Sequence, residues 1–153
     1  MMRSIPLLLC VACATTGPKP YGTIAIKSGA DAAARPASYS VGQGTISSSD
    51  FRASIDNDCV RGFVGSTPLD FCRDARNPNH WTGASGDFTV APSENGHLLR
   101  VDGYMNVAPG RDYSMTQGIE LGQGPQWDEL RKHPALLALA ATAADLRAAH
   151  VRH

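Results

Sequence analysis

Residues 39–72 read YSVGQGTISSSDFRASIDNDCVRGFVGSTPLDFC, a stretch in which apolar residues alternate with small or polar ones. This alternation is typical of half-buried β-strands, because successive side chains of a strand point to opposite faces of a sheet. Polar clusters separate the apolar runs and are typical of turns. The stretch therefore predicts short strands over residues 39–46, 51–55, 59–64 and 69–72.

The same pattern continues on both sides of this stretch. Residues 87–90 and 98–104 form two more apolar runs, and the tight-turn dipeptide Asn95-Gly96 between them predicts a hairpin. Residues 117–121 predict a last strand, and residues 23–27 predict an edge strand near the N-terminus. We therefore expect a mainly β fold, a small antiparallel sandwich or barrel-like domain with a C-terminal α-helix.

The C-terminal part of the chain changes to a helical pattern. Residues 126–133 predict one short helix, and Pro134 begins a second at a position where proline is permitted in a first turn. On a helical wheel the leucines and most alanines of the second helix share one face, while Thr142 and Asp145 lie opposite. We expect this helix to cover one face of the sheet. A partner-binding or membrane-surface helix is the alternative, but the alanine-rich face favours packing on protein.

The first thirteen residues read MMRSIPLLLCVAC, a basic start followed by an apolar run, with the small residue Ala12 directly before Cys13. This order is typical of an export signal, and the apolar run is much shorter than the roughly 20 residues of a membrane-spanning helix. The segment resembles the precursor of a bacterial lipoprotein. That resemblance implies a lipid on Cys13 rather than on Cys10, which follows the bulky Leu9. Ala14 after the cysteine implies the outer membrane.

These observations divide the chain into four segments. We expect a signal peptide over 1–12 and a lipid-anchored flexible tether, containing the edge strand, over 13–38. The β domain is expected over 39–125. A C-terminal helical segment packed on that domain is expected over 126–153.

The remaining cysteines are Cys59 and Cys72, with twelve residues between them. An even pair in an exported protein predicts a disulfide. In the chain-entropy description, such a loop stabilises the fold by about 3 kcal/mol. Zinc is poorly supported, because no Cys-x-x-Cys or His-x-x-x-His pair lies nearby. We predict neither a metal nor a cofactor.

Catalytic motifs are weak in this sequence. Ser85 lies in a Gly-Ala-Ser-Gly string, which lacks the spacing of a nucleophile elbow and is more typical of a turn. Ser85, His97 and Asp102 can be drawn as a nucleophilic triad, but five dispersed histidines allow many such sets. Nothing in the sequence selects this set over the others.

Other polar and aromatic residues also favour structural roles. Asp70, Asp87 and Glu94 offer carboxylates for sugar hydrolysis, although a domain of this size has little room for a deep glycan cleft. Asp56-Asn57-Asp58 has the composition of a calcium loop but the wrong glycine spacing, so a turn is favoured. For Trp81, beside a polar loop, a core position is favoured over a ligand platform.

Charge and composition restrict the function. The chain has 14 basic and 14 acidic residues, so it has no excess positive charge for a nucleic-acid backbone. We predict an envelope protein attached to the membrane by its lipid, with a non-catalytic binding or structural role toward a protein or glycan partner. A small envelope hydrolase and a periplasmic inhibitor or immunity protein are the alternatives.

Overall fold

A computed structural model describes residues 21–29 and 33–151, without the side chains of residues 150 and 151. The described part contains two helices, α1 (Pro125–Lys132) and α2 (Pro134–Val151). It also contains eleven strands: β1 (Gly22–Ile26), β2 (Ala37–Gly42), β3 (Thr45–Ser47), β4 (Phe51–Asp56), β5 (Cys59–Val64), β6 (Thr67–Arg73), β7 (His80–Gly83), β8 (Gly86–Pro92), β9 (Leu98–Ala108), β10 (Arg111–Ser114) and β11 (Gln117–Glu120).

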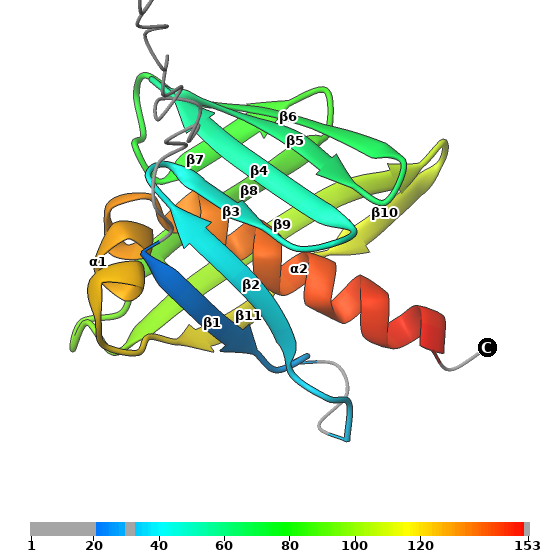
Figure 1. Cartoon of the computed structure of the whole chain (residues 1–153). Coiled ribbons are helices and arrows are strands. Elements are labelled where there is room, and N and C mark those ends of the chain that lie inside the picture. Colours follow the sequence, from blue (N-terminus) through cyan, green and yellow to red (C-terminus); the bar gives the residue numbers. More distant parts are fainter. Residues whose placement is uncertain (1–20, 30–32, 152–153) are drawn as a thin grey trace, which may run out of the picture.

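All the strands form one antiparallel sheet. β1 to β10 pair in chain order, and β11 also pairs with β9. β9 is long enough for both partners, because β11 pairs with its first half and β10 with its second half. The sheet curls around α2, as Figure 1 shows. The prediction of a mainly β, barrel-like fold with a C-terminal helix is confirmed.

Two predicted turns are confirmed, and one predicted strand is divided. The hairpin around Asn95-Gly96 joins β8 to β9, and Asn57 at φ 55° turns the chain from β4 into β5. The strand predicted over 39–46 is instead β2 and β3. Gly44, at φ 62°, reverses the chain between them, and the alternation on both sides hid this turn.

The sheet also begins earlier in the sequence than predicted. β1 pairs with β2 along its whole length, from Gly22 opposite Val41 to Ile26 opposite Ala37. The expected edge strand is therefore an integral part of the sheet, whereas the prediction assigned it to a tether over 13–38. Of that tether, only the part before Gly22 precedes the sheet, and residues 1–20 lie outside the described chain. β10 was not predicted.

Helix α2 packs on the concave face of the sheet, but it is buried on every side from Ala135 to Asp145, so the prediction of a solvent-facing side at Thr142 and Asp145 is wrong. Every residue from Ala135 to Asp145 is buried. Thr142, expected on the solvent side, is 0 % exposed, and its hydroxyl donates to the carbonyl of Ala138. Asp145 is also buried and accepts a hydrogen bond from Ser28 Oγ at 2.7 Å. A helix that is apolar almost all round belongs in a core, and here the curled sheet provides that core.

Glycines on the inner face allow the sheet to curl tightly. A Cβ at Gly62 would overlap with the carbonyl oxygen of Arg52 on the neighbouring strand. Gly103, at φ 145°, would overlap in the same way with the carbonyl oxygen of Asp87. Both positions therefore require glycine, because the neighbouring backbone lies where a side chain would begin.

The core lies between the concave face of the sheet and α2. Its largest side chains include Trp81, which is buried as expected, and the edge-to-face pair Phe71–Phe88 with ring centroids 5.0 Å apart. Leu136, Leu137 and Leu139 contribute from the helix and are fully buried. Among the described residues, neither helix is long and apolar enough to cross a membrane.

Candidate functional site

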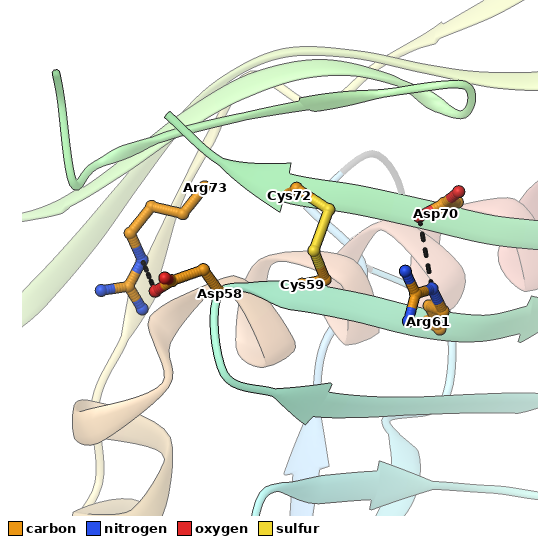
Figure 2. Close-up of a disulfide and its surroundings, with 6 residues drawn as sticks. All are labelled: Asp58, Cys59, Arg61, Asp70, Cys72 and Arg73. Carbon is orange, nitrogen blue, oxygen red and sulfur yellow. Dashed lines mark ion pairs between the residues drawn. A yellow bond between two sulfur atoms is a disulfide. The ribbon is translucent and has the colours of Figure 1, made fainter. Parts of the chain in front are cut away.

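The predicted disulfide between Cys59 and Cys72 is present and lies on the outer face of the sheet. The two cysteines are directly opposite each other on β5 and β6, and both are partly buried. Figure 2 shows the bond crossing between the two strands. Next to it, the backbone N–H of Arg73 donates to the carbonyl of Asp58, which extends the ladder toward the turn.

Two ion pairs flank the disulfide, and the arginine is on β5 in one pair and on β6 in the other (Figure 2). Arg61 Nε on β5 lies 3.7 Å from Asp70 Oδ1 on β6, and Arg73 Nε on β6 lies 3.9 Å from Asp58 Oδ1. Exposed pairs of this kind contribute about 0–1 kcal/mol each. The guanidinium of Arg73 also lies over the ring of Trp81, 4.9 Å from its centroid, so it covers this edge of the core.

A histidine held by two carboxylates lies on the neighbouring strands. His80 Nδ1 is 3.1 Å from Asp74 Oδ2, and His80 Nε2 is 2.7 Å from Asp87 Oδ1. The hydrogen bond to Asp74, followed by the one to Asp87, raises the pKa of His80. The pKa of Asp74 is lowered, mainly by the backbone N–H of Arg76 and next by His80. The protonated imidazole can donate to both carboxylates at once.

This arrangement is suited to holding a loop rather than to acid–base catalysis. Both ring nitrogens of His80 face carboxylates, and among the described residues no hydroxyl hydrogen-bonds to the ring. The loop between β6 and β7 is also closed by backbone bonds, because Asp74 N–H donates to the His80 carbonyl and His80 N–H donates to that of Asn77. His80 therefore connects the loop, through Asp74, to β8, through Asp87.

The triad drawn from Ser85, His97 and Asp102 is not assembled in the described chain. The Ser85 hydroxyl donates to the carbonyl of Pro68 and accepts from the backbone N–H of Asp70. Asp102 instead accepts from the hydroxyl of Thr116 at 2.8 Å, and His97 is exposed in the loop between β8 and β9. Ser85 therefore has a structural role between β6 and the turn that joins β7 to β8.

The other predicted carboxylates are also separate. Asp70 pairs with Arg61, Asp87 pairs with His80, and Glu94 is exposed in the loop between β8 and β9. Within the described ranges, no three His, Cys, Asp or Glu residues are grouped so that they could hold a metal ion. Cys13, the predicted lipidation site, lies outside the described residues.

Sequence reasoning missed the buried carboxylate of Glu129 on α1. Its Oε1 accepts from the backbone N–H of Gly44 at 2.9 Å and lies 3.5 Å from His133 Nε2. Lys132 Nζ lies 3.9 Å from Oε2. The contacts connect α1 to the turn between β2 and β3. The sequence contains no signal for this role, because the two partners are 85 positions apart.

Three large aromatic side chains of the described residues are exposed, and two of them, Phe63 and Tyr104, lie on strands of the outer face. Tyr104 on β9 is directly opposite Asp87, and Phe63 on β5 is directly opposite Pro68; both aromatics are 42 % exposed. Tyr104 therefore lies beside the carboxylate that binds His80. The aromatic ring of Tyr104, the carboxylate of Asp87 and Thr82, which is opposite Asp87 on β7, form a polar and aromatic platform.

Comparison with protein-family models, curated proteins and solved structures finds no match to this chain.

Proposed function

We propose that this protein is exported, anchored to the bacterial outer membrane by a lipid on Cys13, and that it binds a partner without catalysing a reaction. The observation that carries the binding role is the position of α2. The helix fills the space inside the curled sheet, with every residue from Ala135 to Asp145 buried. A small ligand cannot occupy that space while the helix is there, so contacts with a partner fall on the outer surface.

The disulfide supports export. Cys59 and Cys72 are paired across two strands on the outer face, where a reductant can reach them more easily than in a core. Disulfides persist in oxidising compartments such as the periplasm and are rare in the cytosol. A stable bond in this position is therefore expected for a domain that works outside the cytoplasm.

The position of β1 shortens the proposed tether. The sheet begins at Gly22, nine positions after Cys13, so the chain between them spans at most about 30 Å. Gly22 lies at the end of the sheet that α1 covers, since a Cβ there would contact Gln126. We infer that this end faces the membrane and that the end where α2 emerges faces away from it.

The outer face of the sheet offers a surface for a protein or glycan. Tyr104 and the neighbouring Asp87 combine an aromatic face with hydrogen-bond acceptors, and both classes of partner use such groups. In this orientation the outer face of the sheet runs roughly along the direction from the membrane to the far end of the domain. A partner in the envelope can therefore reach it without displacing the anchor.

Fatty-acid labelling of the full chain in bacterial cells tests the anchor. We expect Cys13→Ser to remove the label and to leave a longer, unprocessed precursor. Cys10→Ser is the matched control, because it changes a cysteine three positions away and should be labelled normally. Normal labelling of Cys13→Ser, or loss of the label in Cys10→Ser alone, would refute the assignment.

Binding by the outer face is tested with a photo-crosslinking residue in place of Tyr104 in intact envelopes. A discrete adduct with a protein or with peptidoglycan is expected, and Asp87→Ala should weaken it. The same crosslinker in place of Arg111, at the far end of the domain, is the control. Adducts of equal yield at both positions would indicate contact without a defined surface and would contradict the proposal.

A further inference from the structure

The sheet has an open seam between its first and last strands. Among the strands of residues 21–29 and 33–151, β1 pairs only with β2, and β11 pairs only with β9. A groove of about 660 Å³ lies between them, lined by residues 25–29, residues 117–122 and Trp127. Figure 1 shows β1 and β11 at the same side of the curled sheet. The seam is therefore bounded by two strand edges with no strand between them.

The backbone of β1 presents hydrogen-bonding groups to this seam. The carbonyl of Thr23 accepts a hydrogen bond from Gln126 Nε2 at 3.4 Å, so this carbonyl points away from β2. In an antiparallel ladder, residues alternate between those bonded to the partner strand and those that face the other side. Ala25, two positions along, therefore presents its N–H and C=O to the seam as well.

The backbone of β11 does the same from the opposite edge. Leu121 N–H donates to the carbonyl of His97, and Met115 N–H donates to that of Gly103, so the odd-numbered residues bond to β9. Gly118 and Glu120 consequently face the seam. Within the described chain, no hydrogen bond to the seam-facing backbone groups of Ala25, Gly118 or Glu120 is formed.

The seam lacks the features that protect another free edge of the same sheet. β6 pairs with β7 only at Cys72 and Arg73, and its remaining edge carries Pro68, which has no N–H. Ser85 satisfies the other groups of that edge. Natural edges are commonly blocked by proline, charge or a covering element; β1 and β11 contain no proline, and the charges at the seam, Lys27 and Glu120, lie at its two ends.

Small residues keep the seam accessible from outside. Ala25 is exposed, and a Cβ at Gly118 would meet no atom within 4 Å. The groove is limited at one end by Gly29, which approaches Gln117, and at the other by Trp127, which packs on Gly122. The groove between these limits therefore runs along the length of the two strands, five residues in β1 and four in β11.

We propose that the seam binds a short extended peptide segment of a partner protein, which adds as a strand between β1 and β11. The apolar residues in the lining, among them Ile26, Ile119 and Trp127, suit apolar side chains at the peptide's inward positions. Lys27 and Glu120 lie at opposite ends of the seam, so an acidic residue at one end of the peptide and a basic residue at the other complete the match. This inference rests on the binding role proposed above and names the partner class.

Selection of peptides from a random display library on the full chain, purified in detergent, tests the proposal. The expected peptides carry opposite charges at their ends and apolar residues at alternate positions between them. N-methylation of alternate backbone amides of a selected peptide should weaken its binding about tenfold, as expected for the loss of one or two backbone hydrogen bonds. The intervening amides face the other strand edge, so their methylation should weaken binding as well.

Two variants locate the site on the protein. Ala25→Pro removes a seam-facing N–H that the ladder with β2 does not use, and we expect it to weaken binding about tenfold. Ala25→Val keeps this N–H and should bind normally. The methylated peptides leave the protein unchanged, so they remain informative if Ala25→Pro destabilises the sheet. Amide signals of Gly118 and Glu120 should also become protected from exchange on binding.

The proposal is overturned if no peptide is enriched, if binding is insensitive to N-methylation, or if Ala25→Val weakens it as much as Ala25→Pro. Each of these outcomes leaves fatty-acid labelling at Cys13 and crosslinking at Tyr104 unaffected. Failure of the seam is therefore distinguishable from failure of the anchored, partner-binding role.

Discussion

Lysine in place of Thr142 tests whether α2 lies inside the sheet. Thr142 is 0 % exposed and lies in the middle of a helical run in which every residue from Ala135 to Asp145 is buried. If the helix covered one face of the sheet, as its leucine pattern predicts, position 142 would be in solvent. The two arrangements therefore predict opposite results for the same substitution.

The structure allows the size of the effect to be estimated. The Thr142 side chain bonds to the Ala138 carbonyl, and the nearest carboxylate along the helix, the buried Asp145, already accepts from Ser28 Oγ, so an ammonium group at position 142 would have to compete for it. The first exposed side chain beyond it is Arg147, about 7.5 Å further along the axis, and helical side chains point toward the N-terminus, away from that exit. Burial of an unpaired charge should lower the free energy of unfolding by about 3–5 kcal/mol.

Urea unfolding followed by circular dichroism measures this change. Thr142→Val keeps the volume nearly constant and removes one intrahelical hydrogen bond, so it should cost only about 1 kcal/mol. Arg147→Ala on the exposed part of the helix should change stability by about 0.5 kcal/mol or less. If Thr142→Lys falls in the same range as Arg147→Ala, the helix does not lie inside the sheet.

Three further predictions concern the sheet. Replacing Cys59 and Cys72 together by serine should lower the free energy of unfolding by about 3 kcal/mol, and the unreduced wild-type domain should gain two daltons on reduction (about 1 Da per thiol formed), as mass spectrometry can show; no mass change would exclude the bond. Because the pKa of His80 is raised above 6.5 in the folded state, its contribution to stability should be complete below pH 6.5 and should disappear as the pH rises through the raised value. The urea midpoint should therefore fall as the pH rises above 6.5 in the wild type, and less so in His80→Gln; equal slopes would contradict this role. Gly103→Val should prevent folding or lower the midpoint severely, because a side chain there overlaps with the backbone at Asp87, whereas Gly118→Val, at an open position, should fold.

The sequence predicts the parts of this fold that depend on near neighbours. Alternation over residues 51–55 and 59–64, together with Asn57 in the turn, is sufficient to predict the β4–β5 hairpin and its neighbours. The same signal cannot separate β2 from β3, because Gly42-Gln43-Gly44 continues the alternation through the turn. The pattern describes which residues alternate, but a reversal that preserves the alternation leaves no trace in it.

The candidate site depends on relations that local pattern does not contain. Asp74, His80 and Asp87 lie within fourteen positions of one another, yet their contacts follow from the pairing of β7 with β8 and from the closed loop before His80. Asp87 was identified only as one of three dispersed carboxylates. The seam between β1 and β11 is still less predictable, since it exists only because the sheet curls until its first and last strands are neighbours.

The alanine content of α2 has a physical explanation in the space that the sheet encloses. Barrels of about eight strands are filled by their own side chains, and a wider sheet leaves more room than those side chains occupy. A helix with full-sized side chains is about 10–12 Å across, so a helix that must fit within the remaining space needs small residues on several sides. Ala135, Ala138, Ala140 and Ala141 supply them between the leucines, and all four are buried. Alanine around the whole circumference therefore follows from enclosure, whereas a helix on an open sheet face would need small residues on one side only.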